Sequence, residues 1–173
     1  MKLTPIIDAL ASQYEAALEM LRAAIQATPV EVWDSADYEN RTWRLAYHVL
    51  YGTKMYLASS PETFLVWEGV IEGAESLGGP WEDPSATVVL EDVHSVDELV
   101  AFLESLLAEL PEAIAALPLE ADSGFEWYPF SRLELHLNSI RHIQHHTAQI
   151  IERLRSHGVT GIEWVSGAGA VEW

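Results

Sequence analysis

Apolar residues recur at alternating steps of three and four along four separate segments of this chain of 173 residues. That spacing places them on one face of a helix, so each segment is predicted to be an amphipathic helix. The first helix is expected to open at Thr4 and Pro5, with Thr as its cap, and to end at residues 27–29. The second is expected to begin near residues 40–42 and to run to about Ser59.

The other two segments each begin with a capping box, in which a Ser and a Glu three residues later satisfy backbone amides reciprocally. Residues 95–98 open a helix that Pro111 is expected to kink or end. Residues 131–134 open the last helix, which is predicted to run from Arg132 to His157. Four amphipathic segments of this length, without an internal repeat, indicate an all-α four-helix bundle.

The connections between the predicted helices lack a clear period. Residues 62–70 could form a short helix, and the stretch that follows, to His94, is predicted to be a long irregular connection with a weak strand signal at residues 87–90. Connections of this length are often functional lids or rims, although a simple crossover is an equal alternative.

The chain length is typical of one domain, so residues 1–173 are expected to fold as a single unit. A loop holding Trp33 and Tyr38 is expected to join the first two helices. The small and polar residues from about Ser166 indicate a flexible tail, although its terminal Trp173 could dock elsewhere on the molecule.

The net charge excludes several classes of partner. The chain has 27 acidic residues against 9 Lys and Arg, a formal charge of -18, and such a field repels nucleic-acid phosphates and anionic membrane surfaces. Neither a signal-peptide pattern nor a membrane-length apolar run is found, so a cytoplasmic protein is expected. The chain has no cysteine, so any thiol chemistry must use an external thiol.

Five of the seven histidines fall on the predicted last helix, where their positions matter more than their number. His142 and His146 are one turn apart and about 40° apart around the axis, so both imidazoles can reach the same small volume. His48 lies on the inward side of the second helix, and a glycine one turn later leaves room for it as a third ligand. His145 lies about 60° and His136 about 120° from the pair.

Three neutral imidazoles without a thiolate suit Zn²⁺, Ni²⁺, Fe²⁺ or Cu²⁺. Three protein ligands leave one coordination position open, which is typical of catalytic rather than structural metal sites. The alternative interpretation is that two helical histidines spaced in this way are partly buried and bonded to carbonyl groups, as in many proteins that hold no metal.

Other chemistry-bearing residues have ordinary explanations. His94 precedes a capping box and is expected at the surface, and His157 is interpreted as a cation at the C-terminus of the last helix. Three aromatic residues of the second helix are interpreted as core residues rather than a substrate site: Trp43, Tyr47 and Tyr51.

Seven of the nine basic residues lie on the two helices that carry the proposed ligands. They could pair with the abundant Asp and Glu on exposed faces, where each pair contributes little. Alternatively, Arg44 or Arg141, each near a ligand in the sequence, binds a carboxylate of an anionic substrate.

Residues 142–150, His-Ile-Gln-His-His-Thr-Ala-Gln-Ile, and residues 154–158, Leu-Arg-Ser-His-Gly, resemble the last-helix signature of the DinB/YfiT-like family. That signature is a histidine pair spaced by three, then Gln-Ile or Asn-Ile, and a Leu-Arg-x-x-Gly ending. The single His48 of the second helix also matches. The sequence departs at Ala148, where Gly is frequent, and at His145, which adds an imidazole that could compete as a ligand or act as a base.

The resemblance implies a four-helix bundle with an up-down-down-up course, commonly a homodimer, in which His48, His142 and His146 hold one divalent metal. Family members include thiol S-transferases that use bacillithiol or mycothiol, a thiol-dependent maleylpyruvate isomerase, and proteins described as metal-dependent hydrolases. By this resemblance we expect a metal-dependent enzyme of the thiol S-transferase type. Its Zn or Ni ion, with Fe as a further option, would bind the thiolate of a low-molecular-weight thiol.

Two other functions stay open. The chain could be a hydrolase that uses a water molecule activated by the metal, with His145 or Tyr51 as the general base. It could instead be a stress protein that binds a metal or a small ligand and catalyses nothing. In the enzymatic cases the expected partner is a small-molecule substrate.

Overall fold

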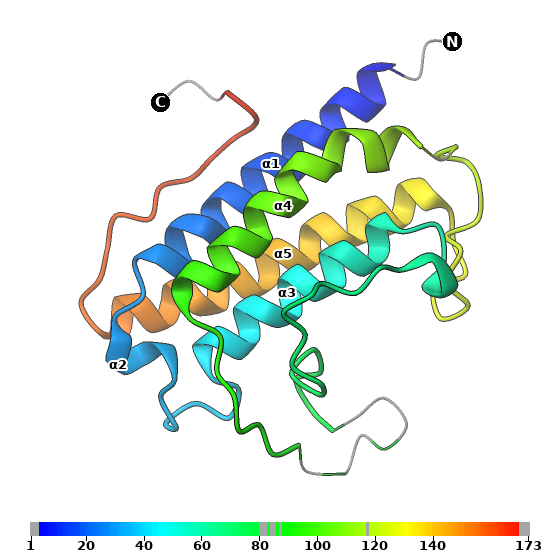
Figure 1. Cartoon of the computed structure of the whole chain (residues 1–173). Helices are drawn as coiled ribbons and strands as arrows, with labels where there is room; N and C mark the ends of the chain where they lie inside the picture. Colours follow the sequence, from blue (N-terminus) through cyan, green and yellow to red (C-terminus); the bar gives the residue numbers. More distant parts are fainter. Residues whose placement is uncertain (1–3, 80–82, 84–85, 87, 117, 170–173) are drawn as a thin grey trace.

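The computed structural model of the chain describes residues 4–79, 83, 86, 88–116 and 118–169, and this part is all-helical, as expected (Figure 1). It forms no strand; one isolated antiparallel bridge joins Asp122 and Ser131. The helices are α1 (Thr4–Gln26), α2 (Val30–Trp33), α3 (Thr42–Leu57), the 3-10 turn η1 (Pro61–Thr63), α4 (Val96–Ala115) and α5 (Arg132–Ser156).

The four long helices lie side by side, with α1 and α3 each packed against both α4 and α5. Two contacts give the relative direction of α1 and α5. The hydroxyl of Tyr14 lies 3.1 Å from Nδ1 of His136, and farther along both helices Gln144 donates to the sulfur of Met20. The two helices therefore run in the same direction.

Two contacts between α3 and α4 give the same result for that pair. The ring of Tyr47 packs against the ring of Phe102, and Lys54 Nζ donates to Glu109 Oε1 at 2.9 Å. Both helices advance together along these contacts, so α3 and α4 run in the same direction.

α3 and α5 run in opposite directions, because the start of each helix meets the end of the other. Arg153 near the end of α5 donates to the hydroxyl of Thr42 at the start of α3. At the other end, Arg132 in the first turn of α5 donates to the carbonyls of Ala58 and Ser59, each at 2.8 Å. Arg132 is only 2% exposed, so a buried cation ties the beginning of α5 to the end of α3.

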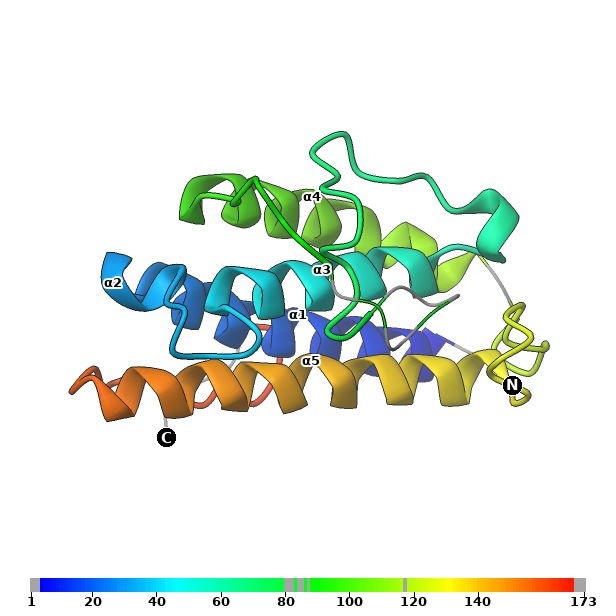
Figure 2. The same cartoon turned by 90° about the horizontal axis from the view of Figure 1, so that it is seen from below.

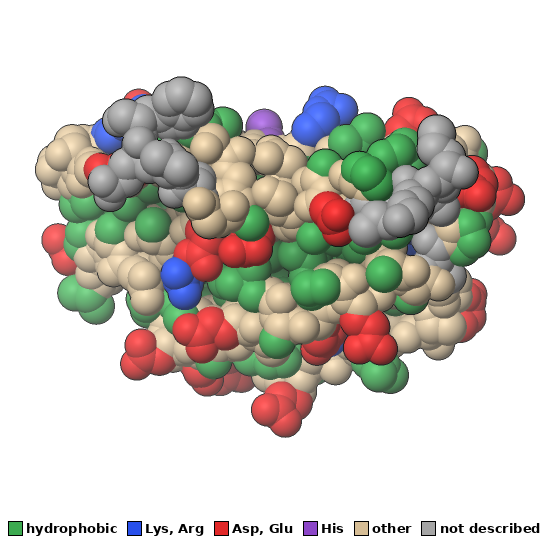
Figure 3. Space-filling view, turned by 90° about the horizontal axis from the view of Figure 1, so that it is seen from above, with side chains coloured by type: hydrophobic (Ala, Val, Ile, Leu, Met, Phe, Trp, Pro, Cys, Tyr) green, Lys and Arg blue, Asp and Glu red, His purple; other side chains and the backbone are tan. Residues whose placement is uncertain are grey.

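The aromatic residues of α3 lie mostly in the core between the helices. Trp43 and Tyr47 are fully buried, which confirms their interpretation as core residues. Tyr51 is half-buried, with its ring against that of Phe64 in the irregular connection. The surface around this core is rich in carboxylates, and Asp and Glu side chains border much of the face shown in Figure 3.

The connection between α3 and α4 is irregular, as expected, but the short helix suggested for residues 62–70 is wrong. A capping box between Ser60 and Thr63 closes one 3-10 turn, and no helix follows it. Trp67 then stacks on Phe102 of α4, while Leu65 is 79% exposed. The described part of this segment crosses the outer side of α3 (Figure 2).

Some predicted helix ends differ from the observed ones. α2 forms one turn, Val30–Trp33, inside the expected loop, and α4 continues through Pro111 to Ala115. Pro111 has no amide hydrogen to donate, so it removes one hydrogen bond of α4 without ending the helix. The capping box at Ser95 is confirmed, whereas at α5 only one half forms, with Ser131 accepting from the Glu134 amide.

The chain after α5 returns along α1. The carbonyl of Ser166 accepts a hydrogen bond from the Gln13 amide at 3.0 Å, and the Ala168 amide donates to Ser12 at 2.8 Å. Trp173 and Thr87 lie outside the described residues. No helix in the described part of the chain has the length and apolar character needed to cross a membrane.

Gly124→Ala is expected to lower the free energy of unfolding by more than about 2 kcal/mol. Gly124 has φ 84, and a Cβ there would overlap the carbonyl oxygen of Ser59 and lie 2.9 Å from Nη2 of Arg132. Gly158→Ala is the matched control, because Gly158 has φ 78 but open space around it. Urea unfolding measures both variants; equal losses would contradict a steric role for Gly124.

Candidate metal centre

Three histidines converge between α3 and α5. His48, His142 and His146 each offer one ring nitrogen, and these nitrogens all lie within 4.8 Å of one another. The ring centroids are 4.8 Å apart for His48 and His142, 5.0 Å for His48 and His146, and 4.7 Å for His142 and His146. The structure thus brings together the three residues predicted as ligands, close enough to hold one metal ion.

Helix geometry and one small residue produce this convergence. His142 and His146 stand one turn apart on α5, and α3 runs antiparallel to α5, so His48 meets the pair from the facing helix. Gly52, one turn beyond His48, lies next to the His142 ring, and a Cβ there would be 3.6 Å from its Cε1. The predicted space at Gly52 is therefore space for the His142 imidazole.

Two of the three rings have hydrogen-bond partners on the nitrogen that faces away from the centre. His48 Nδ1 lies 2.6 Å from the carbonyl oxygen of Glu75, and His146 Nδ1 lies 2.7 Å from Oε1 of Gln149. Both acceptors require an N–H on Nδ1, which leaves Nε2 of each ring as a lone-pair donor. Such outer partners fix the ring orientation and the tautomer of metal ligands.

The third ring is arranged differently. His142 Nε2 lies 2.9 Å from Nε2 of His48, and His142 Nδ1 is buried without a hydrogen-bond partner. Because His48 carries its proton on Nδ1, the proton between the two Nε2 atoms belongs to His142. A cation at the centre would replace this proton and take lone pairs from both rings, so the donor set fits a divalent transition metal.

Burial keeps these imidazoles uncharged near neutral pH. Burial lowers the pKa of His48 to about 4, an effect that the Glu75 carbonyl partly opposes. Burial, and then the neighbouring histidines, lower the pKa of His142 to about 3, and burial also lowers the pKa of His146. Neutral imidazole is the form that binds a metal.

The two candidate general bases lie beside the three histidines without joining them. His145 is exposed, with its ring centroid 4.8 Å from that of His146. Tyr51 lies on α3 one turn from Tyr47, and burial together with the Glu75 carboxylate raises its pKa. Neither residue belongs to the group of nitrogens close enough to share an ion.

Of the two arginines predicted to bind an anionic substrate, one lies beside the centre. Arg44 stands one turn before His48 on α3 and is 9% exposed, and its Nη2 donates to the carbonyls of Gly73 and Gly78 at 3.1 and 3.3 Å. Arg141 is exposed on α5. No sequence pattern indicated that Arg44 would also fasten the irregular connection.

His94 is buried, with 4% of its surface exposed, so the prediction that it lies at the surface is wrong. Its ring packs against those of Trp43, Tyr47 and Trp67. These partners come from α3 and from an irregular segment, and no periodic pattern indicates such packing. His157 lies at the C-cap of α5, the place predicted for it, with its Nδ1 3.0 Å from the carbonyl of Arg153.

Acid is expected to destabilise the protein through His136, which is buried at 2% exposure. Burial and the Arg132 guanidinium lower its pKa to about 4, whereas an unfolded histidine titrates near 6.5. The unfolded state binds more protons between these values, so stability falls as the pH drops from about 6.5 to 4 and the loss ends below that window. This group contributes on the order of 3 kcal/mol at most.

Urea unfolding across this pH range measures the effect. His136→Gln should show a shallower decline in stability than the unmodified chain, and exposed His145→Gln should leave the decline unchanged. An identical pH dependence in all three proteins would contradict the role of His136.

Comparison of the chain with protein-family models, with curated proteins and with solved structures finds no match in any of the three.

Proposed function

We propose that this chain is a DinB-like metal-binding protein in which His48, His142 and His146 hold one divalent transition metal. The observation that carries the proposal is the convergence of the three ring nitrogens within 4.8 Å. The helix order adds support, because α1 and α5 run one way and α3 and α4 the other, as in an up-down-down-up four-helix bundle. A homodimer is part of the same proposal.

The proposed activity is transfer of a low-molecular-weight thiol to an electrophile. His48, His142 and His146 would hold the Zn or Ni ion with one coordination position open, and the ion would supply a thiol of lowered pKa as the nucleophile. The chain's own contribution is positional. The carbonyl of Glu75 and the side chain of Gln149 hold two of the imidazoles in the tautomer that binds a metal.

The test is a conjugation assay with protein purified without nickel resin. Glutathione or cysteine and an activated aryl chloride are supplied to the metal-free protein, to the protein with added Zn²⁺ or Ni²⁺, and to His48→Ala. Turnover is expected only with metal and only with the intact histidines. Conjugation that continues in chelator, or that His48→Ala retains, would refute the proposed activity.

Hydrolysis is the second candidate, and one observation favours it. Oε2 of Glu75 is buried without a hydrogen-bond partner, and the carboxylate acts electrostatically on Arg44, Tyr47 and Tyr51, on the side of α3 that carries His48. A buried carboxylate in that position is suited to accept a proton. Glu75→Gln should then abolish esterase turnover and leave metal content unchanged; unchanged turnover would exclude this role.

A further inference from the structure

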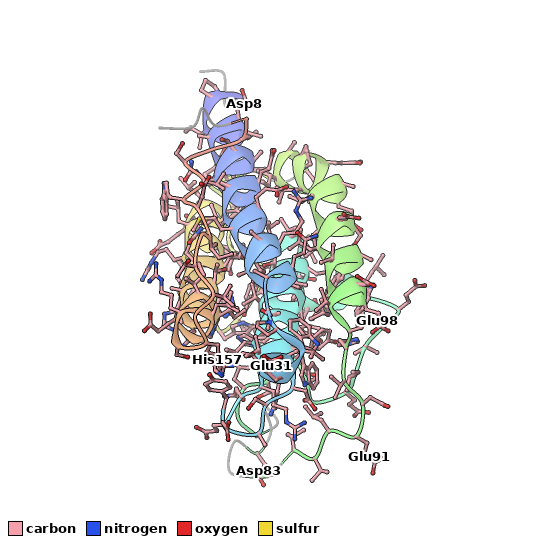
Figure 4. The ribbon with its side chains drawn as sticks, turned by 90° about the vertical axis from the view of Figure 1, so that its left-hand side faces the viewer. Asp8, Glu31, Asp83, Glu91, Glu98 and His157 are labelled. Carbon is pink, nitrogen blue, oxygen red and sulfur yellow. The ribbon has the colours of Figure 1, made fainter. Side chains whose placement is uncertain are left out.

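A cleft of about 320 Å³ opens at the end of the molecule where α3 begins. Its walls are the first turn of α3, with Arg41, Trp43 and Arg44, the exposed residue Glu39, and the segment 88–90. Asp83 and Glu91 mark this end of the molecule in Figure 4. A cleft of this volume is the size of a small-molecule site.

The N-terminus of α3 differs from those of α4 and α5. Ser95 and Ser131 cap α4 and α5, but Arg41 at the cap position of α3 makes no side-chain hydrogen bond to the helix. The first helical bond runs from the Leu45 amide to the Arg41 carbonyl, and no acceptor among the described residues receives the amides of residues 42–44. These amides and the helix dipole favour negative charge at this end of α3.

Arg44 is a second, independent sign of a ligand. Its side chain is nine-tenths buried in the wall of the cleft, and its Nε has no hydrogen-bond partner. Its Nη2 donates to the carbonyls of Gly73 and Gly78. Within the described part of the chain, no carboxylate lies within ion-pair distance of its guanidinium. A buried cation with an unpaired hydrogen-bond donor lowers the stability of the fold unless an anion binds to it.

Among the described residues, the other charged groups at the cleft are already paired or face water. Arg41 pairs with Asp34 at 2.6 Å, so it contributes no free cation. Glu39 is exposed at the rim, where water screens its charge. The Glu75 carboxylate lies near enough to act on Arg44 electrostatically but does not bond to it. In the described part of the chain, Arg44 and the first amides of α3 are thus the groups that remain for a ligand.

We infer that this cleft is an anion-binding site for the carboxylate or phosphate group of a small molecule. The anion accepts hydrogen bonds from Arg44 and from the first amides of α3, and the segment 88–90 covers its apolar part. Arg44 precedes His48 by one turn, about 6 Å along the helix axis. The use of this site to anchor a substrate of the metal centre rests on the proposed function, whereas anion binding itself does not.

Calorimetric titration of the full chain with inorganic phosphate and with succinate, at constant ionic strength, tests the inference. Arg44→Gln should weaken binding at least about tenfold, because it removes a charge-assisted hydrogen bond from a buried site. Arg155→Gln, which makes the same charge change on an exposed residue, should leave the affinity unchanged. Tighter binding of succinate assigns a carboxylate ligand, and tighter binding of phosphate assigns a phosphate ligand.

Arg44→Gln also releases the carbonyls of Gly73 and Gly78, so a second variant is needed. Glu39→Gln removes the negative charge from the rim and should strengthen binding about twofold to threefold, a gain that misfolding cannot produce. His142→Ala should bind the anion as the unmodified chain does, which separates this site from the metal centre. Equal heats in the unmodified chain and Arg44→Gln, or no gain in Glu39→Gln, would overturn the inference.

Discussion

In the His142→Ala variant, bound Zn²⁺ is expected to fall from about one equivalent per chain to none after dialysis. Three imidazoles are the whole donor set in the described part of the chain, so the variant keeps only two ligands. Loss of an outer hydrogen-bond partner already weakens metal binding about 10- to 100-fold, and loss of a ligand must exceed that. Elemental analysis of untagged protein, purified without nickel resin, measures the result.

His145→Ala is the matched control, because it removes a neighbouring imidazole that is exposed and outside the close group of nitrogens. It should keep the full equivalent. The metal should also raise the melting temperature of the unmodified chain, since a ligand at 1,000 times its Kd stabilises by about 4 kcal/mol, and it should leave that of His142→Ala unchanged. Equal metal content in both variants would eliminate the three-histidine site.

Arg132→Ala is expected to lower the free energy of unfolding by at least about 3 kcal/mol. The guanidinium is buried, and it donates at 2.8 Å to the carbonyls of both Ala58 and Ser59. A hydrogen bond from a charged donor contributes about 1.5–3 kcal/mol, and truncation also leaves these carbonyls without their donor. The first turn of α5 would then lose its connection to the end of α3.

Arg141→Ala serves as the control, because it removes the same side chain from the same helix at an exposed position. It should change stability by less than about 0.5 kcal/mol. Arg132→Lys keeps the charge but cannot span the two carbonyls in the same way, so its stability should lie between those of the other proteins. Equal free energies of unfolding for Arg132→Ala and Arg141→Ala, measured in urea, would contradict this stabilising role of Arg132.

The long helices could be predicted because their stabilising contacts follow a period that the sequence displays. α3 and α5 end within a residue or two of their predicted limits. α2 could not be predicted in this way, since one turn is too short to show a period. Pro111 does not end α4, because a proline removes one hydrogen bond of the helix and the residues after it can still continue the helix.

The same distinction applies to the candidate site: local patterns could be predicted and contacts with irregular segments could not. His142 and His146 are a local pattern on one helix, so their shared direction follows from helix geometry alone. Gln149 could have been found by the same reasoning, three residues after His146. The partner of His48 could not, because the carbonyl of Glu75 is a backbone group in an irregular segment and no side-chain pattern marks it.

The separation of the ligands along the chain has a kinetic consequence. His48 and His142 are 94 residues apart, and the irregular connection and all of α4 lie between them. Because its ligands come from both helices, the centre is complete only once α3 and α5 have docked. An interaction absent from the folding transition state slows unfolding and leaves the folding rate nearly unchanged. A metal held here would therefore slow unfolding and lengthen the lifetime of the native state, and it would not raise the folding rate.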